Sequence, residues 1–154
     1  MTEYNTPEMH QIEMLLYKYC DYVDRIATEE LHDLFSEDAV IDYGFNRIFS
    51  GREAIVNLLS SRLCLYSATS HHLSNVQITN LTTNTAECSS YIYAWHQLEN
   101  GSTAEVWGRY FDQVVKENTS WKISKRTIRA AGSRGFTTPD NLPSAFEPIV
   151  RNQG

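Results

Sequence analysis

The stretch Ser70-His71-His72-Leu73-Ser74-Asn75-Val76-Gln77-Ile78 marks the point at which the hydrophobic period of this 154-residue chain changes from helical to alternating. Alternation places His72, Val76 and Ile78 on one face, and we expect this face to point inward because it ends in Val and Ile. A buried imidazole without a partner costs about 1–3 kcal/mol. The sequence therefore predicts that His72 meets a hydrogen-bonding group inside the fold.

Helical spacing precedes this stretch. Thr6-Pro7 has the pattern of an N-cap followed by proline at the first helical position. A short second helix is expected over 28–35, with Phe35 facing inward, and a short strand over 39–43. The capping-box pattern Ser50-Gly51-Arg52-Glu53 then begins a third helix. The apolar residues of the first helix form one stripe: Ile12, Leu15, Leu16, Tyr19, Val23 and Ile26.

Alternating hydrophobicity after residue 70 predicts four strands near 72–80, 85–98, 103–116 and 120–130, joined as an antiparallel meander. Helices followed by a long meander are typical of an α+β domain. A sheet that curves around its helices forms a cone, and ligands bind in its hollow. We therefore expect one cone-shaped domain over residues 1–130. Residues 131–154 are expected to form an arm that covers the cavity or packs on a neighbouring subunit.

Composition and charge exclude several classes of protein. Apolar residues make up 42% and charged residues 21% of the chain, as in an ordinary globular domain. The net charge of −6 and the scattered basic residues argue against nucleic acid and anionic membrane surfaces as partners. No apolar run approaches the roughly 20 residues of a membrane helix, and residues 1–6 lack the apolar core of a signal peptide. Cys20, Cys64 and Cys88 are scattered, which predicts reduced thiols in a cytoplasmic protein.

Asp24, like His72, is a polar residue at a position that is predicted to face inward. Asp24 lies on the apolar stripe of the first helix, where a carboxylate needs a partner. An inward aspartate and an inward histidine together predict a proton-transfer pair in a cavity. Each residue alone has a simpler interpretation, Asp24 as an exposed helix-end carboxylate and His72 as a hydrogen-bonded core histidine.

Two further polar residues are candidates for the same cavity. Arg129 shares a face of the last strand with Trp121 and Ile123, and an arginine at the open end of the cone stabilises developing negative charge. Tyr43 ends the short strand, and its hydroxyl can polarise a carbonyl group or hold a water. The alternatives are an Arg129 that pairs structurally with a carboxylate or reaches solvent, and a Tyr43 that belongs to the core.

Aromatic residues alternate along the second and third long strands. Tyr93 and Trp95 share one face, and Trp107 lies on the next strand. Such residues suit either the wall of a pocket for a flat apolar substrate or a subunit interface. We expect Tyr93, Trp95 and Trp107, together with Tyr19 of the first helix, to contact the substrate.

Cofactor and metal motifs are absent from the sequence. It contains no GxGxxG, P-loop or GxSxG pattern. A metal site would need His71, His72 and His96 to converge, and adjacent residues of a strand point to opposite faces. We therefore expect a small hydrophobic substrate and neither a cofactor nor a metal ion.

The order of several motifs resembles that of the SnoaL-like proteins, which belong to the nuclear transport factor 2-like superfamily of cone-shaped α+β domains. The resemblance covers about Glu8 to Arg129. The motifs that carry it are Glu37-Asp38-Ala39-Val40-Ile41-Asp42-Tyr43, Gly51-Arg52-Glu53-Ala54-Ile55, His71-His72-Leu73-Ser74-Asn75, Trp107-Gly108-Arg109-Tyr110 and Trp121-Lys122-Ile123.

Within the superfamily the chain resembles scytalone dehydratase and hexachlorocyclohexane dehydrochlorinase. The resemblance implies an Asp24–His72 dyad whose histidine removes a proton, Tyr43 and Arg129 in the active site, and a homotrimer. The surroundings of the dyad differ, since Tyr19 stands where the dehydrochlorinase has a functional lysine. The dehydratase's second histidine also has no counterpart in Gly108-Arg109-Tyr110-Phe111. Neither substrate is therefore carried over.

The residues and the resemblance together predict a cofactor-independent lyase that eliminates water or another small group from a hydrophobic cyclic or aromatic molecule. His72 would take the proton from carbon, Asp24 would stabilise the imidazolium, and Arg129 and Tyr43 would stabilise the leaving group or an enolate. An isomerase or an aldol-type carbon–carbon lyase with the same dyad is an alternative. A non-catalytic binding module, or the small subunit of a ring-hydroxylating dioxygenase, is another.

Overall fold

Apart from one short strand over 48–50, which the sequence did not predict, helices and strands follow one another in the order that the hydrophobic period predicts. The computed structural model describes residues 6–135 and 147–150, and within them it contains three helices and six strands. The helices are α1 (Pro7–Arg25), α2 (Thr28–His32) and α3 (Arg52–Leu63). The strands are β1 (Phe35–Asp42), β2 (Ile48–Ser50), β3 (Tyr66–Thr79), β4 (Thr85–Leu98), β5 (Thr103–Glu117) and β6 (Ser120–Arg134).

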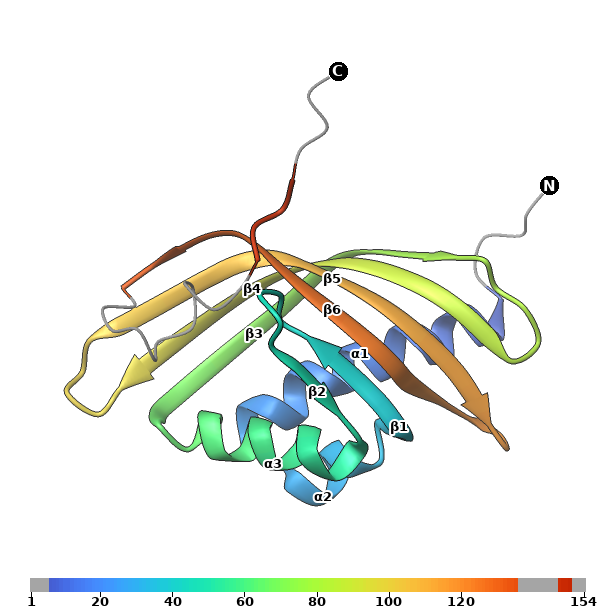
Figure 1. Ribbon diagram of the computed structural model, residues 1–154, viewed down its shortest axis with the longest axis horizontal. Coiled ribbons are helices and arrows are strands. Elements are labelled where there is room, and N and C mark those ends of the chain that lie inside the picture. The colour runs from blue at the N-terminus through green and yellow to red at the C-terminus, as the bar shows by residue number, and fades with distance from the viewer. Residues whose placement is uncertain (1–5, 136–146, 151–154) are drawn as a thin grey trace.

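The strands form one sheet in the order β2-β1-β6-β5-β4-β3. Strands β3 to β6 are the predicted antiparallel meander, whereas β1 joins the sheet by pairing in parallel with β6. The sheet arches over the helices, all of which lie on its concave side (Figure 1). This arrangement confirms the predicted α+β cone and encloses the apolar core between helices and sheet.

Helix α1 begins and ends where local chemistry requires. The Met9 backbone N–H donates to the Thr6 hydroxyl at 3.3 Å, which confirms Thr6 as the N-cap, and Pro7 follows at the first helical position. Ile26 ends the helix in the left-handed conformation, with φ of 51°. The apolar stripe of α1 is buried in the core: Ile12, Leu15, Leu16, Tyr19, Cys20 and Val23.

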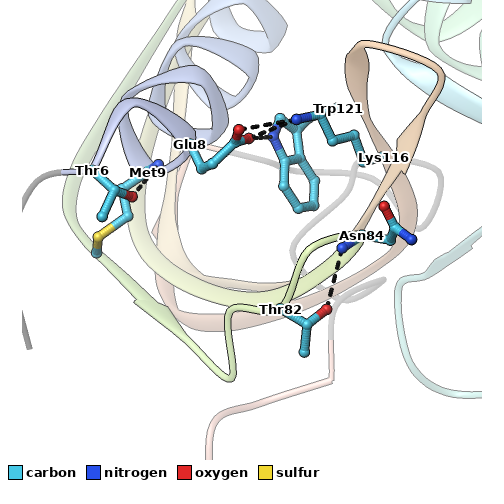
Figure 2. A network of polar contacts seen from close by, with 7 residues as sticks. All are labelled: Thr6, Glu8, Met9, Thr82, Asn84, Lys116 and Trp121. Carbon is cyan, nitrogen blue, oxygen red and sulfur yellow. Dashed lines mark hydrogen bonds and ion pairs between the residues drawn. The ribbon is translucent and has the colours of Figure 1, made fainter.

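A polar anchor ties the first turn of α1 to the end of β5 and the start of β6. The Glu8 carboxylate accepts hydrogen bonds from Lys116 Nζ at 2.9 and 3.0 Å and from Trp121 Nε1 at 2.8 Å (Figure 2). These contacts lower the pKa of Glu8. The positive end of the helix dipole also favours a carboxylate there. The anchor fixes the start of α1 against the far end of the sheet.

Two local predictions about the first half of the chain are wrong. Helix α2 ends at His32, and Phe35 belongs to β1, where it is fully buried. The backbone of Phe35 pairs with that of Ile123, so strand pairing replaces the helical turn that its spacing suggested. Within the described residues Ser50 does not cap α3, which begins after Gly51 at φ of 91°.

Strand β3 contains a β-bulge that decides which side chains face inward. Its pairing with β4 shifts register between Ser74 and Gln77, and Asn75 lies in this gap with φ of 51°. A bulge adds one residue to a strand, so the alternation of faces changes phase across it. Val76 therefore shares the inward face with Leu73 rather than with Ser74.

The predicted arm is described only in part. Strand β6 continues to Arg134, beyond the expected domain boundary at residue 130. Residues 136–146 and 151–154 of the predicted arm lie outside the described residues. Residues 147–150 run beside the sheet, since Pro148 bridges in parallel to Ala130 and the Glu147 N–H donates to the Tyr43 carbonyl at 3.1 Å.

Candidate active site

A cavity lies between the concave face of the sheet and helices α1 and α3. Its wall is mainly apolar and aromatic, with Val23, Leu59, Tyr66, Ile92 and Tyr110 among the lining residues. The cavity volume is about 80 Å³. The predicted hollow of the cone is therefore present and has the character of a small-molecule site.

Asp24 lies at the end of α1, against β3, and is held by three hydrogen bonds. Its Oδ1 accepts from the Thr69 hydroxyl at 2.8 Å and lies 2.6 Å from His71 Nδ1, while Oδ2 accepts from the His71 backbone N–H at 2.8 Å. Partial burial raises the pKa of Asp24, but the hydrogen bonds from His71 and Thr69 outweigh it and hold the pKa below its usual value. Asp24 is therefore an ionised carboxylate at neutral pH.

The carboxylate determines the tautomer of His71. An ionised carboxylate only accepts hydrogen bonds, so His71 Nδ1 carries the proton that lies between the two groups. The other ring nitrogen, Nε2, is then an acceptor, and the His71 ring lines the cavity. An imidazole in this state can take up a proton at Nε2 while Asp24 balances the charge that forms.

The prediction that His72 pairs with Asp24 is wrong, because its neighbour His71 occupies that position. His72 is exposed on the other face of β3, where its Nε2 lies 2.9 Å from the Ser70 hydroxyl and its ring lies 6.0 Å from that of Tyr93. The bulge at Asn75 is the physical reason. The inward direction of Val76 and Ile78 does not extend past the bulge to the histidines.

A second histidine, which sequence reasoning did not select, also lines the cavity. His96 of β4 is almost fully buried, and its ring centre lies 5.5 Å from that of His71 and 4.7 Å from that of Tyr66. Burial, reinforced by the nearby His71, lowers the pKa of His96 to about 4. His96 is therefore a neutral imidazole at pH 7, next to the Asp24–His71 pair.

The floor of the cavity rests on a buried ion pair. Arg126 of β6 donates from Nε and Nη2 to the two carboxylate oxygens of Asp112 at 2.8 and 2.9 Å, and both side chains are fully buried. The guanidinium carbon lies 4.0 Å from the ring centre of Tyr19 and 4.2 Å from that of Tyr110. The Arg126 guanidinium therefore lies against the rings of two tyrosines that line the cavity.

The predicted residues Tyr19, Tyr43 and Arg129 all line the cavity, but they differ in their surroundings. Tyr19 and Tyr43 are buried, and desolvation raises the pKa of both phenols. The Arg129 guanidinium is engaged by carboxylates, with Nη2 at 3.2 Å from Asp42 Oδ2 and 3.7 Å from Glu147 Oε2. Arg129 therefore has the structural pairing that was its alternative interpretation.

The prediction that Tyr93, Trp95 and Trp107 line the pocket is wrong. Tyr93 and Trp107 are each 39% exposed, and they lie opposite one another on β4 and β5. Trp95 shares their face by alternation, whereas Ala94 and His96 of the same strand line the cavity. The aromatic residues lie on the convex face of the sheet, away from the helices. The alternative interpretation, a subunit interface, stays a prediction.

The described part of the chain shows neither a metal cluster nor a membrane-spanning helix. Across residues 6–135 and 147–150, no three His, Cys, Asp or Glu side chains gather closely enough to bind a metal ion. No helix in the same part of the chain is long and apolar enough to cross a bilayer.

An α+β cone with an apolar cavity between its helices and its curved sheet defines the nuclear transport factor 2-like class of domains. The family model for the SnoaL-like domain matches residues 6–127, and the chain therefore belongs to the SnoaL-like family. No curated protein matches it.

Solved structures agree with this assignment. A protein from Novosphingobium aromaticivorans, provisionally assigned as a scytalone dehydratase, is 32% identical, with a TM-score of 0.87 over 98% of this chain and 99% of that one. A provisionally assigned aromatic ring hydroxylase from the same species is 26% identical, with a TM-score of 0.77 over 85% and 96% of the two chains. The type 3 hexachlorocyclohexane dehydrochlorinase from Novosphingobium barchaimii shares the fold at 15% identity, with a TM-score of 0.75 over 88% and 94%.

Proposed function

We propose that this protein is a cofactor-independent lyase that eliminates water or another small group from a small cyclic or aromatic molecule. The observation that carries the proposal is the hydrogen-bonded Asp24–His71 pair beside an apolar cavity. The 32% identity to a protein provisionally assigned as a dehydratase points to the same class of reaction.

In the proposed reaction His71 is the general base. Its Nε2 takes a proton from a carbon atom of the substrate, the C–H electron pair becomes the new double bond, and the leaving group departs from the adjacent carbon with its own bonding pair. Asp24 stabilises the imidazolium that forms, and such acid–base assistance contributes typically 10²–10⁴-fold. A departing hydroxide needs one proton to leave as water, and His71 can supply the proton that it removed from carbon. The proton balance of the dehydration therefore requires no cofactor.

Neighbouring residues have supporting roles in this proposal. His96, which is neutral at pH 7, can hydrogen-bond to the departing oxygen. The Tyr43 hydroxyl lies in the wall of the same cavity and can stabilise an enolate. The carboxylates that engage Arg129 reduce its ability to stabilise an anion, so we assign it a lesser part than the sequence suggested.

The two adjacent histidines provide a matched test. His71→Ala should reduce turnover by at least about 100-fold. His72→Ala changes the same residue type one position away, on the convex face, and should leave turnover within about twofold of wild type. The substrate is sought in a panel of ring-bearing alcohols and halides, with the olefinic product followed by mass spectrometry. Equal losses in both variants would contradict the proposal.

An isomerase or an aldol-type carbon–carbon lyase would begin with the same proton removal. Product mass separates the three reactions, because isomerisation leaves the mass unchanged, dehydration removes one water, and aldol cleavage yields two fragments. Elimination is preferred because both dehydratase-like and dehydrochlorinase structures share this fold.

A second candidate function follows from the 26% identity to the provisionally assigned ring hydroxylase. In that case the chain would be a subunit of an oxygenase and would not turn over substrate alone. Co-purification of an oxygenase subunit with the tagged chain, together with unaltered complex activity in His71→Ala, would favour this candidate.

We also propose that the protein is a cytoplasmic homotrimer, as the family resemblance implies. The exposed aromatic side chains on the convex face of the sheet offer apolar area for such an assembly: Tyr91, Tyr93, Trp107 and Phe111. Sedimentation equilibrium measures the mass directly, and a monomer at micromolar concentration would contradict this assignment.

A further inference from the structure

The charged residues of the cavity wall are all of one sign. Arg47, Arg62 and Arg129 line the cavity, and no aspartate or glutamate lines it among the described residues. The chain as a whole carries a net charge of −6, so a cluster of three arginines has the opposite sign to the net charge of the chain. A neutral hydrophobic substrate gives no role to a guanidinium group that has no carboxylate partner in a mainly apolar and aromatic wall.

The three arginines differ in whether protein carboxylates neutralise them. Arg129 is paired with Asp42 and Glu147. Arg62, in the last turn of α3, makes no side-chain hydrogen bond or ion pair with any other residue of the described ranges. A half-buried guanidinium presents five N–H donors in a planar fork, which a ligand in the cavity can satisfy.

The Arg62 charge lies at one end of the cavity, next to Tyr43 and Tyr66. Its guanidinium acts electrostatically on both phenols and opposes the desolvation that raises the pKa of each. Arg47 approaches the same place from the turn between β1 and β2, with its guanidinium carbon 5.7 Å from the ring centre of Tyr43. Two positive charges therefore border one end of the cavity.

We infer that the substrate of the proposed reaction carries a carboxylate, which binds at Arg62 while its ring lies in the apolar cavity. A planar carboxylate matches the guanidinium fork, and such charge-assisted hydrogen bonds are about twice as strong as neutral ones. This inference rests on the proposed function, because it names the substrate class for the same cavity.

The position of this anion subsite orients the substrate. The Arg62 charge acts on the Tyr66 phenol, the Tyr66 ring contacts His96, and the His96 ring contacts His71. A carboxylate held at Arg62 therefore directs the opposite part of the ring toward His71. Binding energy at a group that does not react would then place one carbon atom next to the base.

The test compares benzoate with benzamide, which have similar shape and differ in charge. Binding to the full-length protein is measured by isothermal titration calorimetry for wild type, Arg62→Gln and Arg25→Gln. Arg25 is an exposed arginine of α1 that pairs with Asp21 outside the cavity, so its variant controls for the loss of one positive charge.

Wild type and Arg25→Gln should bind benzoate roughly 10- to 100-fold more tightly than benzamide, and Arg62→Gln should lose most of this preference. Equal affinity for the two probes in wild type, failure of wild type to bind benzoate, or a preference that survives in Arg62→Gln would overturn the inference. The measurement needs no turnover. A protein that prefers benzoate yet eliminates nothing would refute the lyase proposal alone, and an active lyase without the preference would refute the anion subsite alone.

Discussion

Replacing Asp24 with asparagine should reverse the tautomer of His71. The present carboxylate offers Oδ2 to the His71 backbone N–H and Oδ1 to both the Thr69 hydroxyl and His71 Nδ1. The backbone N–H can only donate, so the amide oxygen of the introduced asparagine should take the place of Oδ2. The amide NH₂ then faces Nδ1, which must accept, and the ring proton moves to Nε2.

The size of the expected loss in kcat follows from these contacts. A histidine protonated on the nitrogen that faces the cavity cannot act as base, and the charge that stabilises the imidazolium is also lost. We expect kcat to fall by about 10²–10⁴-fold, or about 3–5 kcal/mol of barrier. The opposite amide orientation would set two donors against each other at a cost of about 1–3 kcal/mol, which is why we expect the reversal.

Two measurements check this expectation. Long-range ¹H–¹⁵N spectra report the tautomer of His71 without any substrate, and steady-state kinetics report kcat. Asp21→Asn is the matched control, because Asp21 is an exposed carboxylate one turn earlier in α1 that pairs only with Arg25 among the described residues. Retention of the proton on Nδ1 in Asp24→Asn, with kcat within tenfold of wild type, would refute the reasoning.

Three other predictions concern stability. Burial holds the pKa of His96 at about 4, against 6.5 for an exposed histidine, so the unfolded chain binds this proton first as the pH falls. The free energy of unfolding should therefore fall by about 3 kcal/mol between pH 6.5 and 4. Urea titrations of His96→Gln should lack this pH-dependent loss. Arg126→Met should lower the free energy of urea unfolding by about 3–5 kcal/mol, because Asp112 is left buried and unpaired. The double variant Arg126→Met with Asp112→Leu should recover most of this loss. Equal losses in the single and the double variant would contradict the prediction. Gly108→Ala should lower Tm, since a Cβ there would lie 2.1 Å from the Arg129 carbonyl oxygen; an unchanged Tm in calorimetry would show that the strands can separate without cost.

The meander could be predicted because its alternation is uninterrupted. The predicted strand 85–98 coincides with β4, Thr85–Leu98, and the turns on either side of it contain Asn80 and Gly101 in left-handed conformations. The position of β1 in the sheet could not be predicted in this way. It pairs in parallel with β6, some 90 residues later in the chain, and local periodicity contains no information on such a pairing.

The histidine that pairs with Asp24 lies one residue from the predicted one. A carboxylate on an apolar stripe needs a partner, so the sequence indicates Asp24, and the structure contains that partner. The choice of His72 over His71 failed because Asn75 adds a residue to β3, and the only local sign was an asparagine, a residue type that tolerates positive φ. The direction of Tyr93 could not be decided because both faces of β4 carry large or apolar side chains.

The anchor at Glu8 makes α1 a strut with a role at each end. The helix has 19 residues and is therefore about 28 Å long. At one end Glu8 binds to side chains of β5 and β6, and at the other end lies Asp24. A small pivot about the core would translate into a displacement of the carboxylate, because a helix transmits rotation as a rigid body. Directed evolution of this protein should therefore include Glu8 and Lys116 in its libraries, because a change there would be expected to alter the position of the Asp24 carboxylate.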